Sequence, residues 1–146
     1  MAASKVKPPI LLDTGVISRI IRRKPAFLAA LDEMEKTRTL YTTFVTRLEL
    51  YEWVRLNRKT FGERVYRQNL QSIGLFPLLA HTPAVTAQAL ALGQHLPHIG
   101  VADYINAASA LVGKCPLFTL NRKHFLRTNV KLYEPAGFDF AEHGSG

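Results

Sequence analysis

Four polar residues of this sequence, three of them carboxylic acids, stand at or near the starts of segments with helical spacing. They are Asp13, Glu49, Asp103 and Asn121. Carboxylate and amide oxygens are the ligands that Mg²⁺ and Mn²⁺ prefer. Clustered carboxylates raise one another's pKa when no cation is near, and a divalent ion would neutralise them. Because such an ion can activate water and stabilise charge on a phosphate, the residues suggest metal-assisted phosphodiester hydrolysis.

Strands that alternate with helices are expected to position these residues. Short apolar or β-branched runs predict strands at 10–12, 40–44, 75–79, 117–119 and 130–133. Helical spacing predicts helices at 14–22, from Pro25 onwards, and at 46–57, 60–73, 83–96, 102–113 and 122–127. This alternation is typical of an α/β domain with three α/β/α layers and a central, mostly parallel sheet.

The length of 146 residues suits a single domain with one core. We expect this domain to occupy residues 1–146, with its core at about 10–133 and a disordered tail at 139–146. The lone Cys115 excludes an internal disulfide and a cysteine-based zinc site. No apolar run is long enough for a signal peptide or a bilayer span, so a cytoplasmic protein without membrane contacts is expected.

In a parallel sheet the carboxyl ends of the strands meet at one edge, where ligands bind. Asp13 directly follows one predicted strand, Asn121 comes two residues after the end of another, and Asp103 opens a helix that should start from the same edge. We therefore expect these residues and Glu49 to converge. A purely structural interpretation remains open, because Asp13 and Asn121 are good N-caps and Asp103 would suit a helix dipole.

Glu49 allows two interpretations. It stands three residues after Thr46, which is the spacing of a capping box. It also shares a helical face with Trp53 and Leu56, so its carboxylate is expected to be partly dehydrated and to favour a cation.

The net charge of +8 and the pI of about 9.9 favour a polyanionic partner, either a nucleic acid or an acidic protein. The basic residues gather at 19–24, 55–67 and 122–127, each group following one of the site residues. They could flank the site and hold an RNA backbone, and we expect Arg22 and Arg23 to position the substrate. Alternatively, these clusters are ordinary solvated helix faces.

Four motifs occur in a characteristic order and spacing. They are LLDTGVI at 11–17, TRLELYE at 46–52, VADYINAASAL at 101–111 and FTLNRKHF at 118–125. Together they resemble a PIN domain, most closely the VapC-type toxins of prokaryotic toxin–antitoxin pairs. The resemblance extends from about Ile10 to Tyr133. It implies a small α/β/α endoribonuclease that depends on Mg²⁺ or Mn²⁺, is restrained by a cognate antitoxin and forms a homodimer.

Carried over by position, Asp13, Glu49 and Asp103 match the acidic metal-site residues of this family. Asn121 matches the fourth site position, which is an acid in some members and asparagine in others. An asparagine removes a formal charge, so the resemblance implies that a second metal ion binds weakly or only with substrate.

Three further residues are compared with the family pattern. Thr14 and Thr119 match polar positions beside the site and are expected to help position the substrate. Asn106 stands where many members have an alanine, and we expect it to matter little for catalysis.

Other functions stay open at this point. A phosphatase that forms an aspartyl-phosphate on Asp13 would want a second acid two residues later, where Gly15 stands. A receiver-like domain would add acids near Asp13, and Pro8, Pro9 and Ile10 offer none. A degenerate PIN module that acts as an RNA or protein scaffold is opposed by the three intact acids. A housekeeping RNA-processing nuclease would share the site and lack the antitoxin.

The segment 68–102 contains no Asp, Glu, Lys or Arg. Within it, Val85, Ala89 and Leu92 recur at helical spacing, and Ala87, Leu90 and Ala91 cover a neighbouring face. A helix that is apolar on most sides is buried on most sides, and interface cores are depleted in charge. We therefore expect this helix to pack against its own copy in a two-fold homodimer. The alternative is that the segment belongs to the ordinary core.

Overall fold

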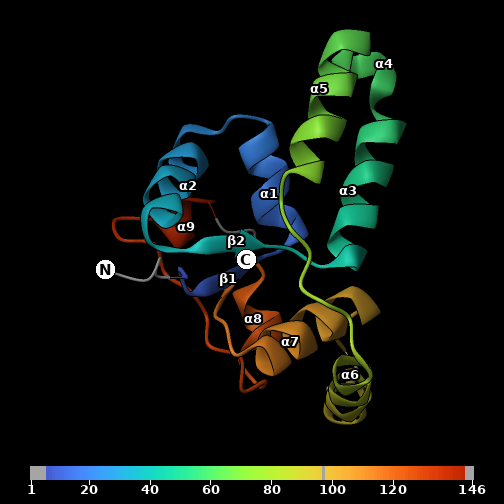
Figure 1. Cartoon of the computed structure of the whole chain (residues 1–146), viewed down its shortest axis with the longest axis vertical. Coiled ribbons are helices and arrows are strands. Elements are labelled where there is room, and N and C mark those ends of the chain that lie inside the picture. Colours follow the sequence, from blue (N-terminus) through green and yellow to red (C-terminus); the bar gives the residue numbers. More distant parts are fainter. Residues whose placement is uncertain (1–5, 97, 144–146) are drawn as a thin grey trace.

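A three-stranded parallel sheet lies at the centre of the molecule (Figure 1). The structure is a computed structural model and describes residues 6–96 and 98–143. Strand β1 (Pro9–Leu12) lies between β2 (Thr39–Tyr41) and β3 (Leu117–Phe118), with Ile10 opposite Leu40 and Leu12 opposite Phe118. The expected α/β class and parallel sheet are confirmed.

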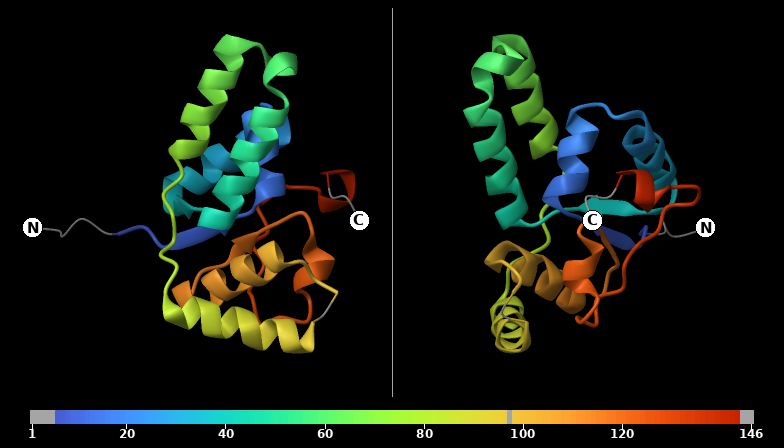
Figure 2. Two further views of the ribbon diagram at one scale, coloured as in Figure 1. Left: turned by 90° about the vertical axis from the view of Figure 1, so that its right-hand side faces the viewer. Right: turned by 180° about the vertical axis from the view of Figure 1, so that it is seen from behind.

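Helices connect the strands and cover both faces of the sheet (Figures 1 and 2). Their bounds are α1 (Thr14–Ile21), α2 (Pro25–Thr37), α3 (Phe44–Leu56), α4 (Arg58–Phe61), α5 (Glu63–Gly74), α6 (Pro83–His95), α7 (Val101–Gly113), α8 (Arg122–Phe125) and α9 (Phe140–His143). Helices α3 and α5 form a long hairpin with α4 at its tip, while α6 packs on α7 at the outer edge of the molecule. In the described residues, no helix is long and apolar enough to cross a membrane.

Alternate residues of the strands enter two separate cores, as the two-residue period of a strand requires. Ile10, Leu12 and Phe118 face the larger core, which α1, α2, α3 and α5 cover. Leu11 and Leu117 face the smaller core, which α7 and α8 cover. These two cores make the three layers that the sequence pattern predicts.

Two of the five predicted strands form only isolated parallel bridges. Leu78 pairs with Thr42 beyond the end of β2, and Leu132 pairs with Leu117 of β3. Proline supplies no N–H to a ladder, and Pro77 stands in the middle of the predicted strand 75–79. Since β3 has only two residues, the segment 130–133 has little strand to pair with.

Several helix boundaries differ from the prediction by one or two residues, and two of the differences have a clear cause. Helix α3 begins at Phe44, with Thr43 as its N-cap accepting a hydrogen bond from the Thr46 N–H, so the capping box expected at Thr46 is wrong. The predicted helix 60–73 is divided into α4 and α5 at Gly62, whose φ of 79° is a conformation that glycine readily adopts.

The predicted disorder of residues 139–146 differs from the structure at its start. Residues Phe140–His143 form the short helix α9. The Phe140 ring packs against Phe138 and Phe118, with ring centroids 4.9 and 6.2 Å away, so aromatic burial holds this segment on the larger core. Residues 144–146 lie outside the described part of the chain.

Candidate active site

The three acids lie on three separate helices that meet beside the end of β1. Asp13 directly follows β1 and is the N-cap of α1, and its side chain accepts from the Val16 N–H at 3.3 Å. Asp103 lies in the first turn of α7. Glu49 lies in the second turn of α3, one turn later than the sequence predicts, because that helix begins at Phe44.

Asp13 is the buried member of this group, with 4% of its surface exposed. Its pKa is raised from 3.8 to about 6, and burial is the main cause. Hydrogen bonds from Thr119 and Val16 oppose this rise, and the charges of Asp103 and Glu49 make smaller contributions to it. Both other acids therefore lie within electrostatic range of Asp13. The expected mutual rise in pKa is seen at Asp13, with burial as its main cause.

Thr119 connects Asp13 to the segment after β3. Its buried hydroxyl donates to Asp13 Oδ2 and accepts from the backbone N–H of Asn121 at 3.0 Å. Asn121 therefore lies next to the residue that orients Asp13. It stands at the predicted N-cap position of α8, but within the described residues its side chain makes no cap hydrogen bond to that helix.

Glu49 is exposed and accepts a hydrogen bond from the Thr14 hydroxyl at 2.6 Å. The dehydration that its neighbours Trp53 and Leu56 predict is wrong, since Leu56 itself is 69% exposed. Trp53 instead packs edge-on against Phe61, with ring centroids 5.5 Å apart. The carboxylate that burial desolvates is that of Asp13.

His124 is a site residue that the sequence reasoning missed. Its Nδ1 lies 2.7 Å from Asp103 Oδ2, and the Asp103 side chain is 19% exposed. One feature of the sequence could have indicated its role, because His124 stands only three residues after the predicted site residue Asn121. The contact itself depends on how α8 packs beside α7, and no local pattern shows that.

The donor set suits a hard divalent cation. It consists of three carboxylates, and the buried Asp13 would ionise more readily beside a positive charge. As the side chains stand, no three His, Cys, Asp or Glu residues within 6–96 and 98–143 form a group that could hold a metal ion. Thr14 engages Glu49 and His124 contacts Asp103, so binding an ion would exchange or adjust these contacts.

Arg22 and Arg23 are not brought to the acids. The eight residues of α1 span about 12 Å, and the two arginines follow its last turn while Asp13 precedes its first. The Arg22 guanidinium lies over the Trp53 ring, 5.8 Å from its centroid. Arg23 lines a groove formed by α1, α2 and the segment after α5.

Other cations lie closer to the acids. Arg19 turns back along α1 and donates to the Gly15 carbonyl at 3.1 Å. Lys123 and Arg127 line a cavity of about 320 Å³ together with His124, which contacts Asp103. Lys123 and Arg127 are therefore connected to Asp103 through His124, whereas Arg22 and Arg23 lie at the other end of α1 from Asp13.

Known proteins share the sequence pattern and the fold of this chain. Residues 10–131 match the PIN domain family. Among curated protein sequences no relative matches. The fold is similar to that of VapBC2 from Rickettsia felis bound to a promoter DNA fragment, with a TM-score of 0.72, 21% identity, and 85% of this chain and 96% of that chain covered.

Two further structures are similar. VapBC-1 from nontypeable Haemophilus influenzae has a TM-score of 0.66 and 22% identity, with coverage of 86% of this chain and 96% of that chain. FitAcB from Neisseria gonorrhoeae has a TM-score of 0.63 and 25% identity, with coverage of 86% and 97%. The chain thus spans the fold that these proteins share.

Proposed function

This chain belongs to the PIN domain family, and we propose that it is an endoribonuclease that uses Mg²⁺ or Mn²⁺ and acts as the toxin of a toxin–antitoxin pair. One observation carries the proposal. The buried Asp13, with its raised pKa, lies within the electrostatic influence of Asp103 and Glu49, which come from two other helices. Such an arrangement is unfavourable without a cation and suits a metal-assisted reaction at phosphate.

In the proposed mechanism Asp13, Glu49 and Asp103 would hold the ion. When bound, the ion would activate water and stabilise negative charge on the scissile phosphate. The Val16 N–H and the Thr119 hydroxyl fix both oxygens of Asp13.

The remaining site residues are proposed to orient Glu49, a water molecule or the substrate, or to bind phosphates of the RNA. Thr14 orients Glu49 through its hydroxyl. Asn121, whose backbone N–H donates to Thr119, carries an uncharged carboxamide that we assign to orient a water molecule or the substrate. Lys123 and Arg127 would bind phosphates of the RNA that flank the scissile bond.

Incubation of the purified chain with single-stranded RNA tests this function. We expect endonucleolytic cleavage in Mg²⁺ or Mn²⁺, loss of cleavage in excess chelator, and recovery when the ion is restored. Single-stranded DNA of the same sequence is the matched substrate control and should stay intact. RNA binding without cleavage under any of these conditions would favour the scaffold alternative.

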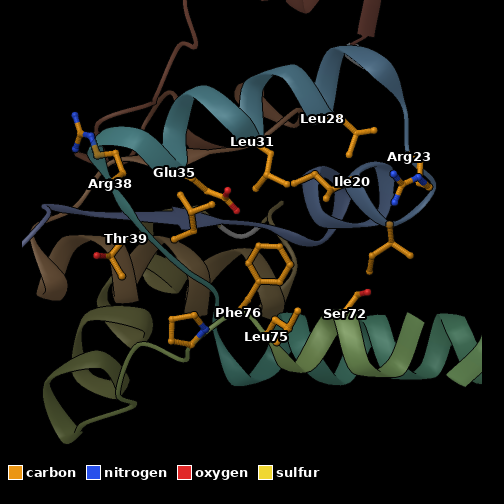
Figure 3. Close-up of a pocket in the computed structure, with 13 residues that line it drawn as sticks. Ile20, Arg23, Leu28, Leu31, Glu35, Arg38, Thr39, Ser72, Leu75 and Phe76 are labelled. Atoms are coloured by element: carbon orange, nitrogen blue, oxygen red, sulfur yellow. The ribbon is translucent and has the colours of Figure 1, made fainter. Parts of the chain in front are cut away.

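An apolar groove of about 410 Å³ is the proposed docking site of the antitoxin (Figure 3). Ile20, Leu31 and Phe76 lie along it, and Arg23 and Arg38 lie toward its two ends. Two arginines beside an apolar floor suit an amphipathic segment that carries acidic residues, and the net charge of +8 favours an acidic partner. The similarity to toxin–antitoxin complexes supports this partner class.

Leu75 offers a test of this groove because it lines the groove and is 78% exposed, so replacing it should leave the fold intact. We expect Leu75→Arg to weaken binding of the cognate antitoxin by at least about tenfold, measured by calorimetry. Leu56→Arg, on α3 and outside the groove, is the matched control. Equal affinity of Leu75→Arg and wild type would place the antitoxin elsewhere.

Helix α6 is the proposed interface of a homodimer. It packs on α7 through Val85 and Leu92, and Leu90 on another face is 67% exposed. Ala89 is half-buried and lines a cavity beside Leu90. The charge-free surface of α6 at the outer edge of the molecule (Figure 2) therefore supports self-association.

Light scattering after size exclusion tests this interface. We expect a wild-type dimer at micromolar concentration and a monomeric Leu90→Arg variant, because a buried unpaired charge opposes association. Leu56→Arg, which changes an equally exposed leucine on α3, should remain dimeric. A monomeric wild type, or a dimeric Leu90→Arg variant, would contradict the proposal.

A further inference from the structure

Asn106 joins the two helices that carry Glu49 and Asp103. It lies on α7 three residues after Asp103, and Thr46 lies on α3 three residues before Glu49, so each pair shares a helix face. Asn106 Oδ1 accepts from the Thr43 hydroxyl at 2.5 Å, and Asn106 Nδ2 donates to Thr46 Oγ1 at 3.1 Å.

The contact continues from Thr46 to the acid site. Thr14 Oγ1 lies 3.3 Å from Thr46 Oγ1 and 2.6 Å from Glu49 Oε1. A hydroxyl has one proton and a carboxylate only accepts, so the Thr14 proton points toward Glu49. Thr46 must then donate to Thr14, and it can do so because its own oxygen accepts from Asn106. We call these five residues, Thr43, Asn106, Thr46, Thr14 and Glu49, the Asn106 network.

Because the network is largely buried, any other hydrogen-bonding arrangement of these residues is energetically unfavourable. Thr43, Thr46 and Asn106 are buried, with each polar group of the network paired. A buried donor or acceptor that loses its partner is unfavourable by about 1–3 kcal/mol, which opposes a flip of the Asn106 amide. Thr43 also accepts from the Thr46 N–H, so the same group fixes the start of α3.

We propose that Asn106 is a positioning residue of the metal site, acting through Thr46 and Thr14 on the orientation of the Glu49 carboxylate. The same contacts of Asn106 with Thr43 and Thr46 also join α7 to the start of α3. This inference rests on the proposed function. It replaces the expectation that Asn106 matters little, which came from comparing one position with a family pattern and not from its contacts.

A double-mutant cycle can distinguish this positioning role from a purely structural one, in which Asn106 only completes the hydrogen bonds of Thr43 and Thr46. Mn²⁺ affinity of the full chain without RNA can be measured by electron paramagnetic resonance. We expect Asn106→Ala and Thr14→Val each to weaken Mn²⁺ binding by about tenfold, the loss typical of a residue that orients a metal ligand. In the Thr14→Val background, Asn106→Ala should add less than about a further twofold. An equal loss in both backgrounds would overturn the network.

Ser109→Ala is the matched control, since Ser109 is buried on the same helix one turn after Asn106 and outside the network. It should bind Mn²⁺ like the wild type. If Asn106→Ala does not fold, Thr46→Val breaks the same network, and its wild-type Mn²⁺ affinity would overturn the inference. If the wild type binds Mn²⁺ and Asp13→Asn does not, while Asn106→Ala binds normally, only this inference fails. A wild type that binds no Mn²⁺ would overturn the proposed function and this inference together.

Discussion

Asp13→Asn is expected to reduce RNA cleavage by about 10³-fold or more, which corresponds to about 4 kcal/mol of transition-state stabilisation. Asp13 is the acid on which the other two carboxylates act, and an amide cannot replace its charge. Asp103→Asn should have a comparable effect. Rates are to be measured with saturating Mn²⁺ and a defined single-stranded RNA, using enzyme in excess so that the first turnover is observed.

Asp32→Asn provides the control for this loss. Asp32 is an exposed acid on α2 that pairs only at 3.9 Å with Lys36, so its replacement should leave the rate unchanged. Circular dichroism and thermal unfolding should show that all variants are folded. A wild-type rate for repurified Asp13→Asn or Asp103→Asn would show that these acids are not the catalytic site.

The metal-free protein should become more stable when Asp13 is replaced by asparagine. The pKa of Asp13 is about 6 in the folded chain and 3.8 ordinarily, so between these values the folded state holds a proton that the unfolded state has lost. The free energy of unfolding therefore falls as the pH rises from about 4 through 6, and stays lower above that range. The shift corresponds to about 3 kcal/mol at neutral pH.

Denaturant unfolding in chelator can measure this effect. Above pH 7, Asp13→Asn should exceed the wild type in stability by about 2–3 kcal/mol, and the difference should disappear near pH 4. Added Mn²⁺ should stabilise the wild type and leave the variant unchanged, because a ligand stabilises only the state that binds it. Equal stabilities of the two proteins at pH 7.5 in chelator would contradict the raised pKa.

The order of the elements, and the position of the acids at or near the starts of helices, were predictable from the sequence. A polar residue directly after a buried run is easily recognised, and both Asp13 and Thr119 have such positions. Helical spacing likewise identified the helices that carry Glu49 and Asp103. These features depend on local periodicity, which a single sequence shows directly.

Features that depend on packing between distant segments were not predictable. Thr43 and Thr46 are equally good N-caps by residue type, and the choice between them follows from how α3 meets α7 through Asn106. The contact of His124 with Asp103 arises from helices that are separate in the sequence. Each partner has an unremarkable local context, and only the fold brings the two together.

The basic clusters show a similar limit. Arg22 follows Asp13 closely in sequence, yet one intervening helix moves it about 12 Å along the axis. Lys123 lies far from Asp103 in the chain and lines a cavity with His124, the residue that contacts Asp103. Nearness to a site residue in sequence is therefore a poor guide to which cations can reach the substrate.

The central claim is that Asp13, Glu49 and Asp103 together hold a divalent ion that acts on RNA. Anomalous diffraction from a crystal of the chain with Mn²⁺ and a non-cleavable RNA tests it most directly. We predict an anomalous peak at coordination distance, about 2.0–2.3 Å, from carboxylate oxygens of at least Asp13 and Asp103 and from a phosphate oxygen of the RNA. A peak at His95 and His98, which line the same cavity as Lys123 and Arg127, or RNA bound without an ion at the three acids, would contradict the account.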